Sequence, residues 1–140
     1  MPNEFKILRR VQFAETDTAG VMHFSNYFRW MEEVEHEWMR SLGMSVIQPH
    51  AVGTVSWPRV TVSCEYFAPV RFEDVVELRL EVMTIGDKSL TYEVTFWKDG
   101  QKTARGRAKA VCCRTFDGGK FESITIPADV RARLEGKGAT

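Results

Sequence analysis

The residues best suited to chemistry lie in one short stretch, FAETDTAGVMHFSNYFRW, at positions 13–30. It carries two carboxylates, Glu15 and Asp17, in a threonine-containing segment that reaches Gly20 and then a lone histidine, His23. A carboxylate can attack a carbonyl carbon itself, or it can take a proton from the water that does so. The aromatic segment that follows has helical spacing. The first turn of a helix offers unpaired N–H groups and a positive dipole end, which stabilise a developing oxyanion.

Asp17 lies seven residues before Phe24, close to the predicted helix start. A loop that bends at Gly20 can fold the carboxylate back toward the amides of the helix. An ester or amide would also need an acid for its leaving group, whereas a thiolate leaves readily because thiols have a pKa of about 8.5. The sparse set of groups therefore favours hydrolysis of a thioester. On spacing alone, an acidic loop that only caps a helix is the alternative.

One long helix is predicted over residues 26–42. Its apolar residues recur every three or four positions, at Tyr27, Trp30, Met31, Val34, Trp38 and Leu42. Ser25 or Asn26 is expected as the N-cap, and Gly43 as the left-handed residue that ends the helix.

The rest of the chain alternates with a period of two, which is typical of half-buried strands. Residues 5–14 are predicted to form a strand, and VVELRLEVM and SLTYEVTFW show the clearest alternation. KDGQ at 98–101 and DGGK at 117–120 are predicted hairpin turns, and GDKS at 86–89 closes another. Residues 127–134 are predicted to form a short terminal helix.

The segment TARGRAKAVCCRTF has two unlike faces. One is a small-residue face that a helix can approach closely, made by Ala104, Gly106, Ala108 and Ala110. The other is a basic stripe, made by Arg105, Arg107 and Lys109. We expect the stripe to be a solvated face paired with Glu77 and Glu81 across the strands, with a phosphate site as the alternative.

An antiparallel sheet with one apolar face has to cover that face, and only one helix is long enough to do so. We predict a single α+β domain, residues 1–140, in which five or six antiparallel strands curl around the helix, with a loose tail at 136–140. Phe28 and Trp30 lie about 200° apart on the helical wheel, so the helix is apolar on several sides. This indicates a homo-oligomer, most simply a dimer, or a bound apolar ligand.

Composition argues against several function classes. Lys+Arg and Asp+Glu both count 19, so no overall field attracts nucleic acid or an anionic membrane. No apolar run approaches the ~18 residues of a membrane-spanning helix, and the first residues lack a secretory apolar region. A cytoplasmic location without stable membrane insertion is expected.

Neither cysteine nor histidine forms a pattern that indicates a metal site. The three cysteines, Cys64, Cys112 and Cys113, include no C-x-x-C pair and are expected to be small buried hydrophobes. Glu32 and His36 share a helix face, but a metal needs at least one or two further ligands. No metal is therefore expected.

The opening stretch, followed by WPRVTVSCEYFAPVRFEDVVEL, resembles the 4-hydroxybenzoyl-CoA thioesterase-like hotdog proteins, including the acyl-CoA thioesterases of the Tol–Pal type. The first motif reads Phe13, Glu15, Thr16, Asp17, Gly20, Val21, Met22 and Tyr27 in this chain. The second block supplies Tyr66, Pro69 and Asp74 at matching spacing. The resemblance covers roughly residues 5–130. It implies a hotdog fold, a long helix wrapped by an antiparallel sheet, which the periodicity predicts separately.

The resemblance implies hydrolysis of an acyl- or aroyl-coenzyme A thioester. Asp17 matches the catalytic aspartate, acting as nucleophile or general base, and the backbone N–H of Phe24 matches the group that polarises the carbonyl. The acyl pocket is expected at the interface of a homodimer, or of a homotetramer. The implied substrate-binding residues are Gly20, Tyr27, Arg59, Val60, Thr61, Ser63 and Lys88, with Lys88 near a coenzyme A phosphate. Coenzyme A is part of the substrate, so no cofactor is expected.

Two positions depart from the family pattern. The first acid of the motif is usually aspartate and is Glu15 here, for which we expect a structural role. Some relatives place a histidine seven residues after the aspartate, where this chain has Phe24, and His23 comes one position earlier. One residue is a rotation of about 100° on a helix. His23 is therefore either a helix-start residue that points away from the thioester or a group that carries a proton or orients water.

Two other function classes use the same fold. Hydratases or dehydratases of acyl thioesters place a histidine and an acid at other positions, so the Asp17 motif argues against them. A non-catalytic acyl-binding module would not need the intact arrangement of Asp17, Gly20 and the helix start.

Overall fold

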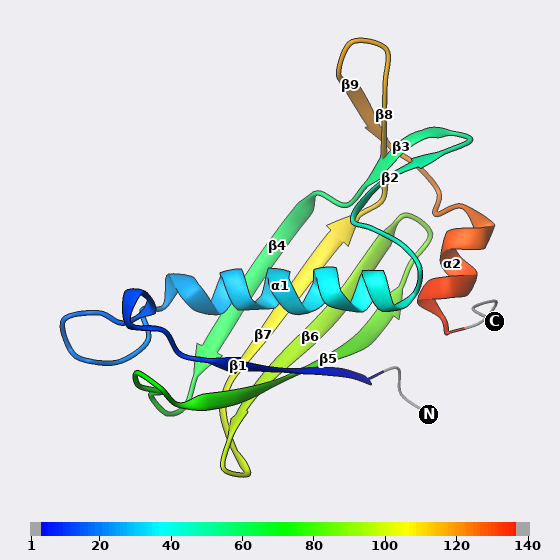
Figure 1. Cartoon of the computed structure of the whole chain (residues 1–140). Helices are drawn as coiled ribbons and strands as arrows, with labels where there is room; N and C mark the ends of the chain where they lie inside the picture. The colour runs from blue at the N-terminus through cyan, green and yellow to red at the C-terminus, as the bar shows by residue number, and fades with distance from the viewer. Residues whose placement is uncertain (1–3, 137–140) are drawn as a thin grey trace.

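The computed structural model describes residues 4–136, in which one long helix lies across a curved antiparallel sheet (Figure 1). The helix is α1 (Ser25–Ser41), within a residue or so of the predicted bounds. The main sheet has the strand order β1-β5-β6-β7-β4. Its strands are β1 (Glu4–Arg10), β4 (Arg59–Tyr66), β5 (Val75–Ile85), β6 (Ser89–Lys98) and β7 (Gln101–Val111). The predicted α+β arrangement of a helix wrapped by a sheet is confirmed.

A second, smaller sheet was not predicted. Its order is β2-β3-β8-β9, and its strands are β2 (Ile47–His50), β3 (Gly53–Ser56), β8 (Cys113–Phe116) and β9 (Lys120–Ser123). Figure 1 shows it projecting beyond one end of the main sheet, next to the short helix α2 (Ala128–Leu134). Each of these strands has only four residues, too few for a period-two pattern to stand out in the sequence.

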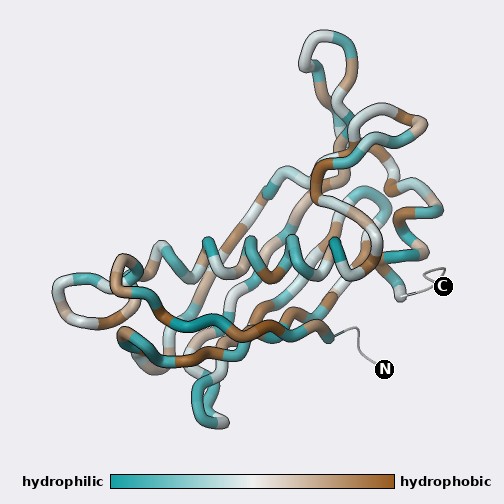
Figure 2. Tube along the Cα trace, in the orientation of Figure 1, coloured by the Kyte–Doolittle hydropathy of each residue, from teal (hydrophilic) through white to brown (hydrophobic). Residues whose placement is uncertain are grey.

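The core lies between α1 and the concave face of the main sheet. Along the strands, apolar and polar residues follow one another (Figure 2). The small-residue face of β7 lies under the helix, because Ala104, Ala108 and Ala110 are buried. At Gly106 an added Cβ would collide with the end of the Met31 side chain, so the glycine leaves room for Met31 where helix and strand approach.

The turn chemistry is as predicted. Asp99 and Gly100 both have positive φ, 50° and 78°, as a two-residue hairpin between β6 and β7 requires. The β5–β6 turn closes with the N–H of Gly86 donating to the carbonyl of Ser89 at 2.8 Å. Gly43, with φ of 75°, ends α1 in the left-handed conformation.

Two local predictions were wrong at the start of the fold. The strand predicted over 5–14 ends at Arg10, and a 3-10 turn, Phe13–Glu15, follows it. The cause is a capping box in which the Glu15 carboxylate accepts a hydrogen bond from the N–H of Gln12 at 2.8 Å. The N-cap of α1 is Phe24 rather than Ser25 or Asn26, and its side chain makes no capping hydrogen bond within the described part of the chain.

The basic stripe on the convex face pairs with acids other than those predicted. Arg105 pairs with Glu65 on β4, and Arg107 pairs with Glu93 on β6 at 2.9 Å. The predicted partners, Glu77 and Glu81, lie on β5, which is separated from β7 by β6. The predicted solvated, paired face is therefore present with different partners.

The three cysteines are free thiols, and the adjacent pair Cys112 and Cys113 is buried as predicted, while Cys64 is half-buried. The predicted loose tail, 136–140, lies outside the described residues except for Gly136.

Candidate active site

The loop that carries Asp17 is a tight hairpin. An isolated bridge joins Thr16 to Met22, and the N–H of Asp17 donates to the carbonyl of Val21 at 2.9 Å. Inside this hairpin the N–H of Gly20 donates to the carbonyl of Asp17 at 3.0 Å, and Gly20 has φ of 83°. The bend at Gly20 is the one expected from the sequence, and its positive φ favours glycine.

The two carboxylate oxygens of Asp17 have different surroundings. Oδ1 accepts hydrogen bonds from the N–H of Ala19 at 2.8 Å and from the N–H of Val21 at 3.4 Å. Oδ2 accepts none from residues 4–136. One oxygen thus fixes the side chain to its own loop, in the manner of an Asx turn, and the other is available to a substrate or a water.

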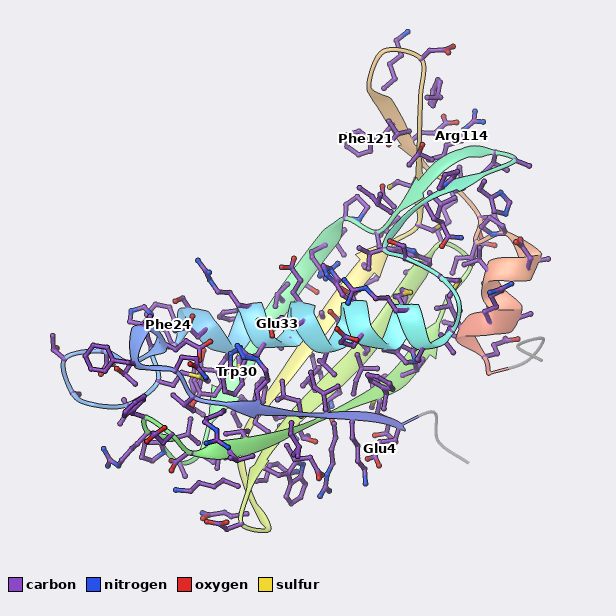
Figure 3. All side chains as sticks on the ribbon, viewed as in Figure 1. Glu4, Phe24, Trp30, Glu33, Arg114 and Phe121 are labelled. Carbon is purple, nitrogen blue, oxygen red and sulfur yellow. The ribbon has the colours of Figure 1, made fainter. Side chains whose placement is uncertain are left out.

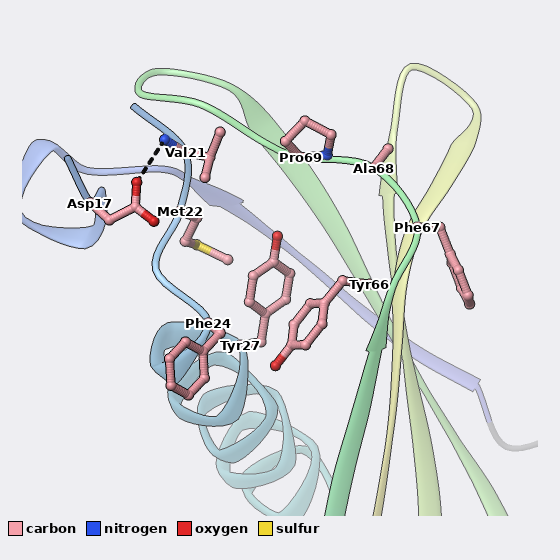
Figure 4. A pocket seen from close by; sticks show the side chains of 9 residues that line it. All are labelled: Asp17, Val21, Met22, Phe24, Tyr27, Tyr66, Phe67, Ala68 and Pro69. Atoms are coloured by element: carbon pink, nitrogen blue, oxygen red, sulfur yellow. Dashed lines mark hydrogen bonds between the residues drawn. The ribbon is translucent and has the colours of Figure 1, made fainter. Parts of the chain in front are cut away.

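Asp17 shares a cavity of about 390 Å³ with the start of α1 and the end of β4 (Figure 4). The cavity is lined by Asp17, Val21, Met22, Phe24, Tyr27, Tyr66, Phe67, Ala68 and Pro69. Three of the predicted site residues, Asp17, Phe24 and Tyr27, therefore meet at one place.

The first turn of α1 leaves one amide open. The N–H of Ser25 donates to Nδ1 of His23 at 3.2 Å, and the N–H of Asn26 donates to the carbonyl of His23 at 3.0 Å. The N–H of Tyr27 donates to the carbonyl of Phe24 at 3.2 Å. The N–H of Phe24 has no hydrogen-bond acceptor among the described residues. This donor, at the positive end of the helix dipole and on a residue that lines the cavity, can polarise a carbonyl oxygen.

Glu15 holds the loop, the strand and the helix together. Its Oε2 accepts hydrogen bonds from Nη2 of Arg9 and Nε1 of Trp30, both at 2.9 Å. Its backbone carbonyl accepts from the N–H of His23 at 2.8 Å and from the side-chain amide of Asn26 at 2.9 Å. Figure 3 shows Trp30 between α1 and β1, and Phe24 at the start of the helix. These contacts are those of a structural residue that positions the cavity.

Tyr27 forms the floor of the cavity. It is only 4% exposed, and its ring contacts those of Tyr66 and Phe96 at centroid distances of 4.8 and 5.2 Å. In Figure 4 its hydroxyl points toward the loop, between Val21 and Pro69. Burial, with smaller contributions from neighbouring groups, raises the pKa of Tyr27 to about 12. The hydroxyl is therefore a neutral hydrogen-bond donor at physiological pH.

His23 lies outside the lining of the cavity. Its Nδ1 is 2.8 Å from the hydroxyl of Ser25, and its ring stacks on that of Phe24 at a centroid distance of 4.6 Å. The imidazole thus serves the helix start, which favours the first of the two interpretations of this residue.

The other predicted binding residues are not brought to this cavity within one chain. Arg59, Val60, Thr61 and Ser63 lie between the start and the middle of β4, whereas the cavity is at the end of that strand. Lys88 is in the β5–β6 turn, next to Ser89, which pairs with Val111. That end of the sheet is the end at which β4 begins.

The end of β4 and the segment after it were not predicted as part of the site. Tyr66, Phe67, Ala68 and Pro69 form one wall, and the N–H groups of Phe67 and Ala68 both donate to the carbonyl of Thr103, at 2.8 and 3.1 Å. The spacing of Tyr66 and Pro69 within the second motif block was the available signal.

Asp74, the third residue of that block, has a different role. Its carboxylate accepts hydrogen bonds from the N–H of Arg71 at 2.7 Å and from Lys98 at 2.9 Å. Partial burial acts to raise the pKa of Asp74, but these hydrogen bonds and the charges of Lys98 and Arg71 outweigh it, so the pKa of Asp74 is lowered. Asp74 therefore stabilises the turn before β5.

Residues 4–136 contain no group of three or more His, Cys, Asp or Glu side chains that could hold a metal ion. Neither helix in the same part of the chain has the length and hydrophobicity needed to cross a bilayer.

Comparison with known proteins gives consistent matches over most of the chain. A family model described as the thioesterase-like superfamily matches residues 11–134. A solved structure from Aquifex aeolicus has a TM-score of 0.81 and 32% identity, covering 93% of this chain and 98% of its own. The 1,4-dihydroxy-2-naphthoyl-CoA hydrolase of Prochlorococcus marinus (strain NATL2A) is 30% identical over 118 residues, 79% of this chain and 76% of that protein.

A solved gentisyl-coenzyme A thioesterase has a TM-score of 0.77 and 30% identity, covering 91% of this chain and 99% of its own. With these neighbours, the expected hotdog fold is confirmed.

Proposed function

This chain belongs to the thioesterase-like superfamily, and from that premise we propose that it hydrolyses an acyl- or aroyl-coenzyme A thioester to the free acid and coenzyme A. The observation that carries the proposal is a single cavity bordered by the carboxylate of Asp17 and by Phe24, whose backbone N–H is open. Two relatives at 30% identity are named for the aroyl thioesters 1,4-dihydroxy-2-naphthoyl-CoA and gentisyl-coenzyme A, which supports the substrate class.

In the proposed reaction the thioester carbonyl oxygen accepts a hydrogen bond from the N–H of Phe24, and the carbonyl carbon faces Oδ2 of Asp17. As a nucleophile, Asp17 forms a mixed anhydride that water then hydrolyses. As a general base, it takes a proton from a water whose oxygen attacks the carbon. In both routes the C–S bond breaks and coenzyme A leaves as a thiolate that takes up a proton. The tetrahedral oxyanion is stabilised by the amide and the helix dipole.

We propose that the active unit is a homodimer paired through β4, with a homotetramer as a further prediction. This strand is an edge of the main sheet, and its Val60 and Val62 are 53% and 41% exposed. Antiparallel pairing of two β4 strands would bring residues 59–63 of one chain beside Tyr66 of the other. The predicted substrate contacts of Arg59, Val60, Thr61 and Ser63 would then be made to the partner's cavity. Lys88 lies at the same end of the sheet as the start of β4, within the proposed reach of a coenzyme A phosphate.

No cofactor is proposed, because the reaction needs only water and the substrate's own thiol leaving group. The prediction that nucleic acid is not a partner follows from the balanced charge. The cytoplasmic location stays a prediction.

The test of the proposed function is Asp17→Asn, measured by release of free thiol from a panel of acyl- and aroyl-coenzyme A substrates. The amide oxygen of asparagine can still accept the hydrogen bonds from Ala19 and Val21, so the loop should keep its shape. We expect kcat to fall about 10³-fold, the size of effect seen when a catalytic carboxylate is lost. Asp99→Asn is the matched control, since it lies in the exposed β6–β7 turn and should leave kcat unchanged.

Thiol release that persists in the Asp17→Asn variant would contradict the proposal. Addition of water to an enoyl-coenzyme A without thiol release would indicate a hydratase. Tight binding of the substrates with neither reaction would indicate a non-catalytic acyl-binding module.

A further inference from the structure

One carboxylate of α1 that takes no part in the proposed reaction is fully buried. Glu35 is 0% exposed, and its Oε1 accepts a hydrogen bond from Nη2 of Arg59. Its Oε2 is buried and accepts no hydrogen bond from any residue between 4 and 136. Burying a carboxylate is costly, and a half-satisfied one is more so. Burying this carboxylate costs more free energy than burying a neutral side chain of the same size. We therefore expect Glu35 to have a specific role.

Arg59 connects this carboxylate to the edge of the sheet. Its Nη1 donates to the backbone carbonyl of Trp57 at 2.9 Å, while Nη2 reaches Glu35 on the helix. The register between β4 and β7 is irregular between Arg59 and Thr61, so the strand begins with a bulge. The planar guanidinium, with donors in fixed directions, thus ties an irregular strand start to α1.

Side-chain packing does little to fix the start of β4 against the helix. A cavity of about 330 Å³ separates the first half of β4 from the helix. Its walls include Val62 and Arg59 from the strand, Phe28 and Met31 from the helix, and Tyr92 from β6. Pairing with β7 holds β4 within the sheet, with Arg59 opposite Ala110 and Thr61 opposite Lys109. Where apolar side chains do not interdigitate, the helix offers the strand no close-packed surface. The ion pair between Arg59 and Glu35 is therefore the contact that links the strand start to α1.

We propose that Glu35 is a positioning residue that fixes the first half of β4 through Arg59, and thereby the wall that this half contributes to the partner subunit's active cavity. The inference rests on the proposed function and on the proposed pairing through β4. It assigns a role in substrate binding to a residue that touches no substrate.

The ion pair depends on the ionisation of Glu35, whose surroundings are mixed. Burial raises the pKa of Glu35 to about 7, although Arg59 opposes the shift, and Glu32 on the same helix adds to it. Tyr92 faces the carboxylate from β6, and Nε2 of His36 lies 4.0 Å from Oε1. Burial lowers the pKa of His36. The ion pair is complete above about pH 7 and is lost as the pH falls below it.

The experiment measures KM and kcat for the best coenzyme A thioester of the panel across the pH range of Glu35 titration. In the wild type we expect KM to rise about tenfold as the pH falls through about 7, with a much smaller change in kcat, because binding rather than chemistry is affected. Glu35→Gln should have the raised KM at every pH. Glu37→Gln is the matched control, on the exposed face of the same helix and paired with Arg40, and it should follow the wild type.

Arg59→Lys is the second variant, because lysine keeps the charge but loses the two-directional contact, and its KM should be raised to an intermediate value. A wild-type KM that is independent of pH would overturn the inference, as would wild-type behaviour of Glu35→Gln. A pH dependence that disappears in His36→Gln would also overturn it, by assigning the titration to the histidine. These outcomes are separate from those of the proposed function, which fails if the wild type releases no thiol or if the Asp17→Asn variant keeps releasing it.

Discussion

At the scale of single residues, three side chains of the same chemical type, all carboxylic acids, have three different roles that are set by their partners. Asp17 has one oxygen fixed by loop amides and the other open at a cavity. Glu15 has both oxygens engaged, one of them by Arg9 and Trp30, and so it holds elements together. Glu35 is buried with one guanidinium as its partner. The role of each carboxylate therefore depends on which of its oxygens lack a hydrogen-bond donor and on whether it borders a cavity.

The burial of Glu35 has a consequence for stability against pH. Its pKa of about 7 in the folded protein lies above the ordinary 4.5, so the folded state retains a proton that the unfolded chain releases. The contribution of this group to stability is complete below about pH 4.5 and is lost as the pH rises through about 7, by at most ~1.4 kcal/mol per pH unit. We expect the free energy of unfolding of the wild type, measured by urea denaturation, to fall over this range relative to Glu35→Gln. A difference that stays constant with pH would contradict the buried, titrating carboxylate.

The sequence was informative about residues whose partners are local. The loop around Asp17 and the structural role of Glu15 follow from neighbours within a short stretch of chain. The N-cap prediction was wrong because the imidazole of His23 accepts the N–H of Ser25, a contact that no capping preference anticipates. The burial of Glu35 depends on Arg59, which arrives from another element 24 residues later.

At the scale of elements, the active cavity depends on how closely α1 approaches the sheet. Gly106→Val tests this approach, because the added side chain would meet Met31 and lies 3.3 Å from the carbonyl of Ser63 even at its Cβ. We expect a loss of about 2 kcal/mol in the free energy of unfolding, typical of overpacking. Combining it with Met31→Ala should cost less than the sum of the two single changes by about 1 kcal/mol, since the smaller side chain makes room.

The matched control combines Gly106→Val with Met39→Ala, a buried residue of α1 that is not among the nearest neighbours of Gly106. Those two changes should be additive within the usual ~0.5 kcal/mol. Equal coupling in both pairs would show that the helix does not rest on Gly106 through Met31.

The long elements could be predicted, and so could the short helix α2 and the turn between β8 and β9, but the four-residue strands could not. α1 and the strands β5, β6 and β7 have ten or more residues each, so their periodicity is clear, and the β6–β7 turn carries an Asp-Gly signal. In the small sheet, β2 reads IQPH and β9 reads KFES, and four residues are too few to establish a period. Those strands form because the ends of the main sheet bring them together.

At the scale of the whole molecule, the two edges of the main sheet are not equivalent. β1 and β4 both expose apolar side chains, with Leu8 on β1 66% exposed. Only β4 borders the active cavity, through Tyr66 and the residues that follow it. Phe24, at the same cavity, is 61% exposed in the single chain, which agrees with the expectation that the helix needs a further partner. A second chain paired with β4 would cover the rings of Tyr66 and Phe24 and complete the cavity. A second chain paired with β1 would do neither.

Val60→Lys tests which edge pairs. A lysine whose charge is buried without a partner at an interface costs about 3 kcal/mol, which weakens Kd by more than a hundredfold. We expect analytical ultracentrifugation to show the wild type as a dimer or larger and the variant as a monomer at the same concentration. Thiol release by the variant should be reduced and should recover as its concentration is raised, because assembly then completes the cavity.

Leu8→Lys, the matched change on β1, should leave the β4 pairing and the activity intact. Dissociation caused by Leu8→Lys but not by Val60→Lys would move the interface to β1, and Arg59–Ser63 would then lie too far from any active cavity to bind substrate.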